Sequence, residues 1–123
     1  MNRRLFLAGL FLVGACASPT RPAALSLKVV ANDDAVQLLN QSDRDTFYFI
    51  YERAAAALID WAPCVDPSRC AFVAPGAQVA VPYAAIGGYA PGKTEAIVWW
   101  WHAGPGPADA PVPGTIHSVV VGL

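Results

Sequence analysis

The chain has little charge, few metal-ligating side chains and no convincing helical segment. Only 14% of its 123 residues are charged, and it contains two His, three Cys and one Met. Eight basic residues against nine acidic ones leave no basic excess, which excludes the positive surface that nucleic-acid binding requires. The length supports one domain and excludes a multidomain enzyme. A hydrophobic content of 55% and an aromatic content of 11% exclude a disordered tail.

The N-terminus has the three parts of an export signal. Arg3 and Arg4 supply the positive end, residues 5–13 form a short apolar run, and small residues follow. A membrane-spanning helix needs about 20 apolar residues, and this run is interrupted before Pro19. We therefore expect residues 1–15 to be a signal peptide that is removed from the mature protein.

Two export routes are open to this signal. Arg3, Arg4, Phe6 and Leu7 resemble the twin-arginine pattern, whose passengers cross the membrane folded. Asn2 stands where that pattern usually has Ser or Thr, and arginine pairs also occur in ordinary signals. The general secretory route is therefore favoured over the twin-arginine route.

The end of the apolar run resembles the lipobox of bacterial lipoproteins. Val13, Gly14 and Ala15 precede Cys16, the position that in this family is lipidated and becomes the mature N-terminus. The resemblance implies a lipid anchor at Cys16, and Ala17 implies sorting to the periplasmic face of the outer membrane in a double-membraned host. The alternative is ordinary cleavage after Ala17, which would leave a secreted or periplasmic soluble protein.

The two remaining cysteines, Cys64 and Cys70, enclose a five-residue loop that contains Pro67. In an exported protein such a pair predicts a disulfide. A metal site is disfavoured because the spacing is not Cys-x-x-Cys and no His lies nearby. A redox-active pair is disfavoured for the same reason of spacing.

Alternating and aromatic-rich runs separated by turn residues predict a chain of short strands. Residues 16–24 read as a tether, and residues 25–123 as the folded domain. Residues 53–55 are interpreted as a bend, and residues 104–114 as irregular because they are rich in proline. The predicted strands lie at 25–29, 35–39, 46–52, 56–61, 71–73, 78–83, 94–102 and 115–121.

This pattern predicts an all-β domain, a single immunoglobulin-like antiparallel β-sandwich of about seven or eight strands, with a small barrel as the alternative. The mature region also looks like small uncharacterised bacterial lipoproteins with an Ig-like domain, a family from which no activity can be transferred. The residues that carry this resemblance are Asn40-x-Ser42, Trp61-x-Pro63-Cys64, Pro75-Gly76 and Trp99-Trp100-Trp101.

The sequence offers no catalytic residues, and we expect a protein that is not an enzyme. No Gly-x-Ser-x-Gly nucleophile turn is present, and most carboxylates lie in turns. Glu52 beside Arg53 reads as a surface charge. His102 and His117, near the ends of a last hairpin, raise the alternative of a metal site, but we expect neither a metal nor another cofactor.

The run Trp99-Trp100-Trp101 carries the main functional ambiguity. Because strand side chains alternate, Trp99 and Trp101 share one face and Trp100 lies on the other, so one sandwich core cannot hold all three. Cross-strand packing with Tyr48, Tyr51 or Trp61 on a half-exposed face is the simplest interpretation. An exposed member of the run would instead form an aromatic binding face.

These observations together predict a lipid-anchored envelope protein that acts as a non-catalytic binding module for an envelope protein partner. The alternative is a carbohydrate or cell-wall binding module that uses exposed Trp99, Trp100 or Trp101. Neither hypothesis involves nucleic acid.

Overall fold

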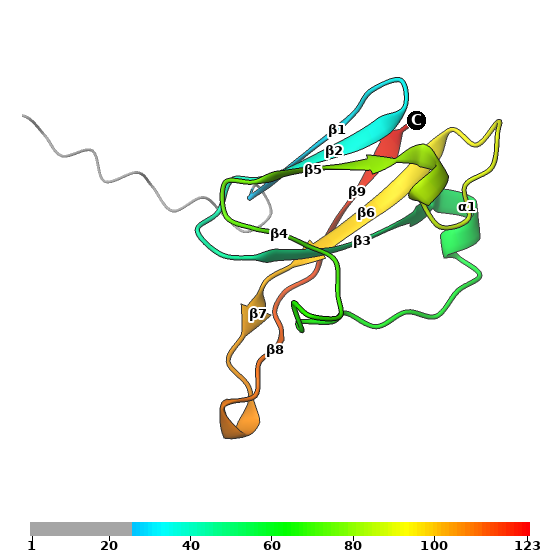
Figure 1. Ribbon diagram of the computed structural model, residues 1–123. Coiled ribbons are helices and arrows are strands. Elements are labelled where there is room, and N and C mark those ends of the chain that lie inside the picture. The colour runs from blue at the N-terminus through cyan, green and yellow to red at the C-terminus, as the bar shows by residue number, and fades with distance from the viewer. Residues whose placement is uncertain (1–25) are drawn as a thin grey trace, which may run out of the picture.

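The computed structural model describes residues 26–123, whose main body is two antiparallel β-sheets packed against each other, with a third sheet of two short strands (Figure 1). The three-stranded sheet has the order β1-β2-β5 and comprises β1 (Leu27–Ala31), β2 (Ala35–Asn40) and β5 (Gln78–Pro82). The four-stranded sheet has the order β4-β3-β6-β9 and comprises β4 (Phe72–Val73), β3 (Thr46–Glu52), β6 (Glu95–Trp101) and β9 (His117–Gly122). The predicted all-β sandwich is thus confirmed, while its immunoglobulin-like character stays a prediction.

The core lies between the two sheets and draws on alternate residues of their strands. Val36 and Leu38 of β2 are fully buried, and they belong to the same cluster as Ile50 of β3 and Val98 of β6. Trp100, 5% exposed, fills the same core with the largest side chain of the cluster. Burial of these alternating side chains stabilises the sandwich and fixes the register of each strand, because a one-residue slip would turn them to the surface.

The prediction of a bend at residues 53–55 and a strand at 56–61 is wrong. A one-turn helix, α1 (Arg53–Ala56), follows β3 directly, and residues 57–71 contain no strand. The Glu52 carboxylate accepts hydrogen bonds from the backbone N–H groups of Ala54 (3.1 Å) and Ala55 (2.7 Å). It therefore supplies the N-cap that a search for Ser, Thr, Asp or Asn does not find. Glu52 is consequently a buried capping residue and not the surface charge that we expected.

The proline-rich segment after β6 is more regular than predicted. β7 (Ala103–Gly104) and β8 (Val112–Pro113) pair antiparallel and form an arm that projects beyond the sheets (Figure 1). Gly106 permits the return of the chain, because a Cβ atom there would lie 2.1 Å from the carbonyl oxygen of Ala110. The sequence does not predict these two strands because each is only two residues long.

The predicted signal peptide (1–15), Cys16 and the tether (16–24) lie outside the described residues. Within residues 26–123, no helix has the length and apolarity needed to cross a membrane.

Candidate functional site

The outer face of the four-stranded sheet, which points away from the core, carries two of the three consecutive tryptophans. Trp99 pairs with Phe49 and Trp101 with Phe47 across the β3–β6 ladder, whereas Trp100 belongs to the core. The run is therefore divided between the two faces as strand alternation predicts. Trp100 and Trp101 are buried, and Trp99 alone of the three is half-buried.

Trp61 packs over these strand residues and joins them into an aromatic cluster. Its ring centroid lies 4.8 Å from that of Phe49, 5.0 Å from Trp99 and 5.6 Å from Trp101. Tyr51 completes the cluster through a stacked contact with Phe49 at 5.7 Å. We call these five residues the aromatic cluster. The packing of Trp61 against Trp99 and Trp101 matches the simplest interpretation of the sequence. Tyr51 instead contacts Phe49, a central member that the sequence did not identify, and Tyr48 lies opposite Trp100 on the core side.

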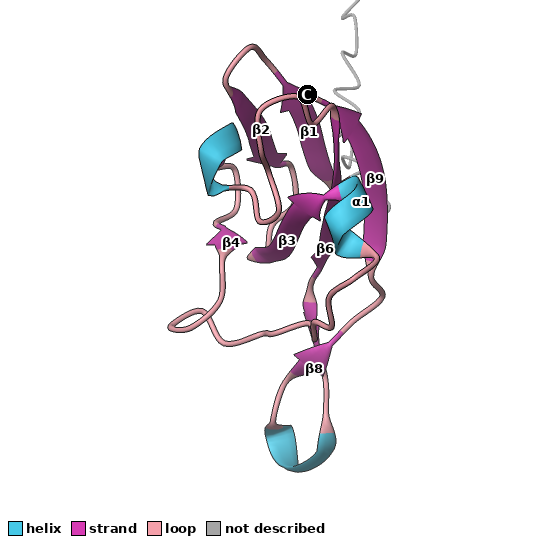
Figure 2. Ribbon diagram, turned by 90° about the vertical axis from the view of Figure 1, so that its right-hand side faces the viewer, coloured by secondary structure: helices cyan, strands magenta, loops and turns pink. Residues whose placement is uncertain are grey.

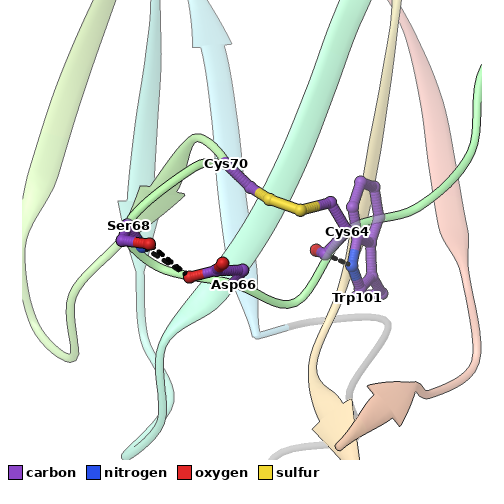
Figure 3. Close-up of a disulfide and its surroundings, with 5 residues drawn as sticks. All are labelled: Cys64, Asp66, Ser68, Cys70 and Trp101. Carbon is purple, nitrogen blue, oxygen red and sulfur yellow. Dashed lines mark hydrogen bonds between the residues drawn. A yellow bond between two sulfur atoms is a disulfide. The ribbon is translucent and has the colours of Figure 1, made fainter.

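The segment that carries Trp61 is fixed to the sheet at the predicted disulfide. Cys64 and Cys70 are bonded, with their Cα atoms 6.0 Å apart, and the indole Nε1 of Trp101 donates a 2.9 Å hydrogen bond to the Cys64 carbonyl oxygen (Figure 3). Within the loop, Asp66 Oδ1 accepts hydrogen bonds from the backbone N–H and hydroxyl of Ser68. These hydrogen bonds lower the pKa of Asp66. The disulfide loop thus covers Trp101 and positions Trp61.

Tyr51 is held at the border of the cluster by two glycines. A Cβ atom at Gly87 would lie 2.2 Å from Cε2 of Tyr51, and Gly88 has a φ of +73° that disfavours other residues. The Glu52 N–H donates to the Gly87 carbonyl oxygen at 2.8 Å. The loop after β5 therefore packs directly against the tyrosine ring and fixes this end of the cluster.

Apolar side chains continue from the cluster to the edge of the sheet. Ile97 of β6 pairs with Val120 of β9 beside the Trp99–Ser118 pair, and Val120 is 44% exposed. Leu58, 87% exposed, begins the segment that leads to Trp61. We call the surface formed by Phe49, Trp61, Ile97, Trp99 and Val120 the apolar outer face. Its half-buried and exposed members give the sheet an unusually apolar surface.

A buried polar network lies at the other end of β3 and involves His102. Its Nε2 lies 2.9 Å from Thr46 Oγ1 and 3.3 Å from Ser42 Oγ, while Nδ1 lies 3.0 Å from Arg44 Nη2. Because a guanidinium only donates, Nδ1 must accept, and the ring proton of the neutral imidazole is on Nε2. Burial first, and then the charge of Arg44, lower the pKa of His102.

This arrangement does not suit a Ser–His catalytic pair. A general base would need an unprotonated Nε2 facing the serine and an acceptor at Nδ1. In this protein Arg44 donates to Nδ1, so Nδ1 is the acceptor and Nε2 carries the proton. The contact between Ser42 and His102 is therefore best interpreted as structural.

The two histidines do not form a metal site with other described ligands. His117 packs on Trp100 with ring centroids 5.8 Å apart, and its buried Nε2 has no hydrogen-bond partner among residues 26–123. In the described part of the chain, no three His, Cys, Asp or Glu side chains come together in a group that would hold a metal ion.

Comparisons of the chain with known proteins found no matching family model, no matching curated protein and no matching solved structure.

Proposed function

We propose that the chain is a non-catalytic binding module of the bacterial cell envelope that binds a protein partner through its apolar outer face. The single observation that carries this proposal is the continuity of that face from the aromatic cluster to exposed Val120. Aromatic rings held in place by packing offer a large contact area at little cost in conformational entropy. A surface of this kind suits protein recognition.

The polar groups of the domain support a non-catalytic role. His102 is engaged with Arg44 and Thr46, and Glu52 is used as a helix cap, so both groups serve the fold. The lowered pKa of Glu52 has the same cause, since its first determinant is the hydrogen bond from the Ala55 N–H. These roles leave neither group poised for acid–base chemistry.

The proposed location rests on the lipobox-like residues before Cys16, with attachment to the periplasmic face of the outer membrane. Its test is the substitution Cys16→Ser, which should transfer the protein from the membrane fraction to the soluble fraction. Retention of the variant in the membrane fraction would show that the anchor is assigned wrongly.

The second candidate is a carbohydrate or cell-wall binding module. Trp99 and Trp61 are half-buried, and an indole ring of this kind can stack on a sugar. One face of Trp61 is stacked on Phe49, however, and Trp99 is tilted by 50° to Trp61, so the two indoles do not form a broad flat platform. This packing is the reason for which we favour a protein partner.

Photo-cross-linking in living cells distinguishes the two candidate functions. A photoreactive amino acid at Leu58, which is 87% exposed and lies three residues before Trp61, should yield a cross-linked protein of defined mass. The photoreactive amino acid placed instead at Val30, which is 46% exposed on the three-stranded sheet, serves as the matched control. It should give no cross-linked protein. Equal cross-linking at both positions, or none at either, would contradict the proposed face.

The sugar candidate has its own measurement. Tryptophan emission titrated with peptidoglycan fragments to millimolar concentration should remain unchanged for a protein-binding module. A saturable change that Trp61→Ala abolishes would instead establish the carbohydrate module.

A further inference from the structure

The sandwich of residues 26–123 has four edge strands, and one of them lacks the features that keep sheet edges from pairing. β1 carries Lys28, β4 is two residues long, and β5 ends at Pro82. Lysine, proline and short length each discourage the addition of another strand. β9 is six residues long and contains no Lys, Arg, Asp, Glu or Pro. Among the described strands it pairs with β6 alone, and Figure 2 shows it at the rim of the four-stranded sheet.

The backbone groups of β9 divide between β6 and the outer edge, where no other described strand pairs with it. The Leu123 N–H donates to the Thr94 carbonyl oxygen at 2.8 Å, in the same register as the ladder. Residues of an antiparallel pair alternate between hydrogen-bonded and non-hydrogen-bonded positions. The backbone N–H and C=O groups of the odd-numbered residues of β9 therefore point toward β6. The N–H and C=O groups of Ser118, Val120 and Gly122 therefore point away from the sheet.

We propose that β9 pairs antiparallel with β9 of a second copy of this chain, so that two four-stranded sheets join into one eight-stranded sheet. A two-fold axis at Val120 places Val120 opposite its own copy and Ser118 opposite Gly122 of the other copy. This register uses all three outward-facing positions of the strand and forms six hydrogen bonds. It is the self-complementary arrangement that a symmetric interface requires.

The composition of β9 favours its own copy as the partner. A strand with charges of one sign would repel itself at a two-fold axis, and β9 has none. Val119 and Val120 are 39% and 44% exposed, so pairing would remove apolar surface from water on both faces of the joined strands. This inference goes beyond the proposed function. It shares Val120 with the apolar outer face, but it uses the outward-facing backbone groups of β9, which a partner seated on the aromatic cluster does not need.

A single pair of six-residue strands makes a small interface beside the roughly 1,200–2,000 Å² of stable complexes. The dimer should therefore depend on concentration. A lipid anchor would raise the local concentration of the two copies on a membrane, as tethering does for any weak contact. The experiment accordingly uses the full-length chain in bacterial cells and a covalent readout that traps the contact.

The test substitutes a cysteine at each of two neighbouring valines. In the proposed register the two Cα atoms at position 120 lie about 5.5 Å apart, within the disulfide range. Val120→Cys should therefore give a covalent dimer on a non-reducing gel that reductant abolishes. Val119→Cys is the matched control, because it is similarly exposed but faces residue 121 of the other copy. The Cα atoms of residue 119 in the two copies are displaced by about 7 Å along the strand, beyond the reach of a disulfide.

We expect at least about tenfold more dimer from Val120→Cys than from Val119→Cys. Equal dimer from both would indicate random collision, and dimer from Val119→Cys alone would indicate another register; either result overturns the proposal. Absence of any dimer, or a cross-link to a protein of different mass, overturns it as well.

A second pair of variants covers the case in which a cysteine at position 120 prevents folding. Chains carrying Ser118→Cys and Gly122→Cys, expressed together, should cross-link to each other, while neither cross-links when expressed alone. Cross-linking of either variant alone, or of neither combination, refutes the register.

Discussion

Asn40 is the fully buried centre of a hydrogen-bond network that joins the end of β2 to the turn before β3 and to β4. Its Nδ2 donates to the carbonyl oxygens of Arg44 (2.6 Å) and Val73 (2.8 Å), while its Oδ1 accepts from the N–H and hydroxyl of Ser42. The two carbonyl partners fix the orientation of the amide, because they can only accept. Asn40→Asp keeps the shape of the side chain and replaces both donors with an acceptor.

The cost of this substitution follows mainly from the Val73 carbonyl group, which loses its side-chain donor in the core, because the Arg44 carbonyl oxygen also accepts from the Ser42 hydroxyl at 3.0 Å. A buried polar group left unsatisfied costs about 1–3 kcal/mol, so Asn40→Asp should destabilise the domain by about 1–3 kcal/mol at pH 7. That loss is a large share of the roughly 5–15 kcal/mol that stabilises a domain of this size. The carboxylate faces two carbonyl oxygens, so its pKa in the folded state should rise above the ordinary value of about 3.9.

The sign of the pH dependence follows from that raised pKa. A group whose folded-state pKa is raised contributes most to stability below its unfolded pKa, and the contribution is lost as pH rises through the folded pKa. The deficit of Asn40→Asp should therefore be smallest near pH 4 and larger at pH 7. Urea unfolding followed by tryptophan fluorescence at the two pH values measures both deficits.

The same substitution at Asn32 is the matched control. Asn32 is exposed, and its Oδ1 only accepts, from the N–H groups of Asp34 (3.1 Å) and Ala35 (2.9 Å). Asp supplies the same acceptor, so Asn32→Asp should change the free energy of unfolding by no more than about 0.5 kcal/mol. An unfolding midpoint for Asn40→Asp equal to that of the Asn32 variant would refute the reasoning.

Three further predictions concern the site and its supports. Trp61→Ala should lower the free energy of unfolding by about 2–3 kcal/mol, since it removes three ring contacts from a half-buried position. Leu58→Ala should change the free energy of unfolding by less than about 0.5 kcal/mol. A similar loss from both substitutions would contradict the packing role of Trp61. The double substitution Cys64→Ser and Cys70→Ser should cost about 2 kcal/mol, as expected for closing a short loop, and an unchanged urea midpoint would count against it. Because burial lowers the pKa of His102, the stability that it contributes is present above its unfolded pKa of about 6.5 and lost as pH falls through its lower folded pKa. A His102→Gln variant should show a weaker loss of stability over that acidic range, and an undiminished loss would place the titration elsewhere.

Most of the strands could be predicted because their signals are local. Residues 46–52 match β3 at both ends, and the alternation within residues 99–101 places Trp100 on the face opposite to Trp99 and Trp101. The Cys64–Cys70 bond could also be predicted, because a closely spaced cysteine pair behind a predicted export signal favours a disulfide over a metal site. The prediction failed in the segment after β3, where the cap of α1 is the side chain of Glu52, the last residue of the strand itself.

The sequence by itself determined the alternation of side chains along each strand, the turns and the position of the short disulfide loop, because each depends on residues that are neighbours in the chain. Only the tertiary structure decided that Trp101 is buried, since the cover is provided by Cys64, 37 residues earlier in the sequence. It also decided that β9 is an edge strand, because the position of a strand in a sheet depends on which others pair with it. Both outcomes arise from contacts between distant segments, and hydrophobic patterning along one strand carries no information about its neighbours.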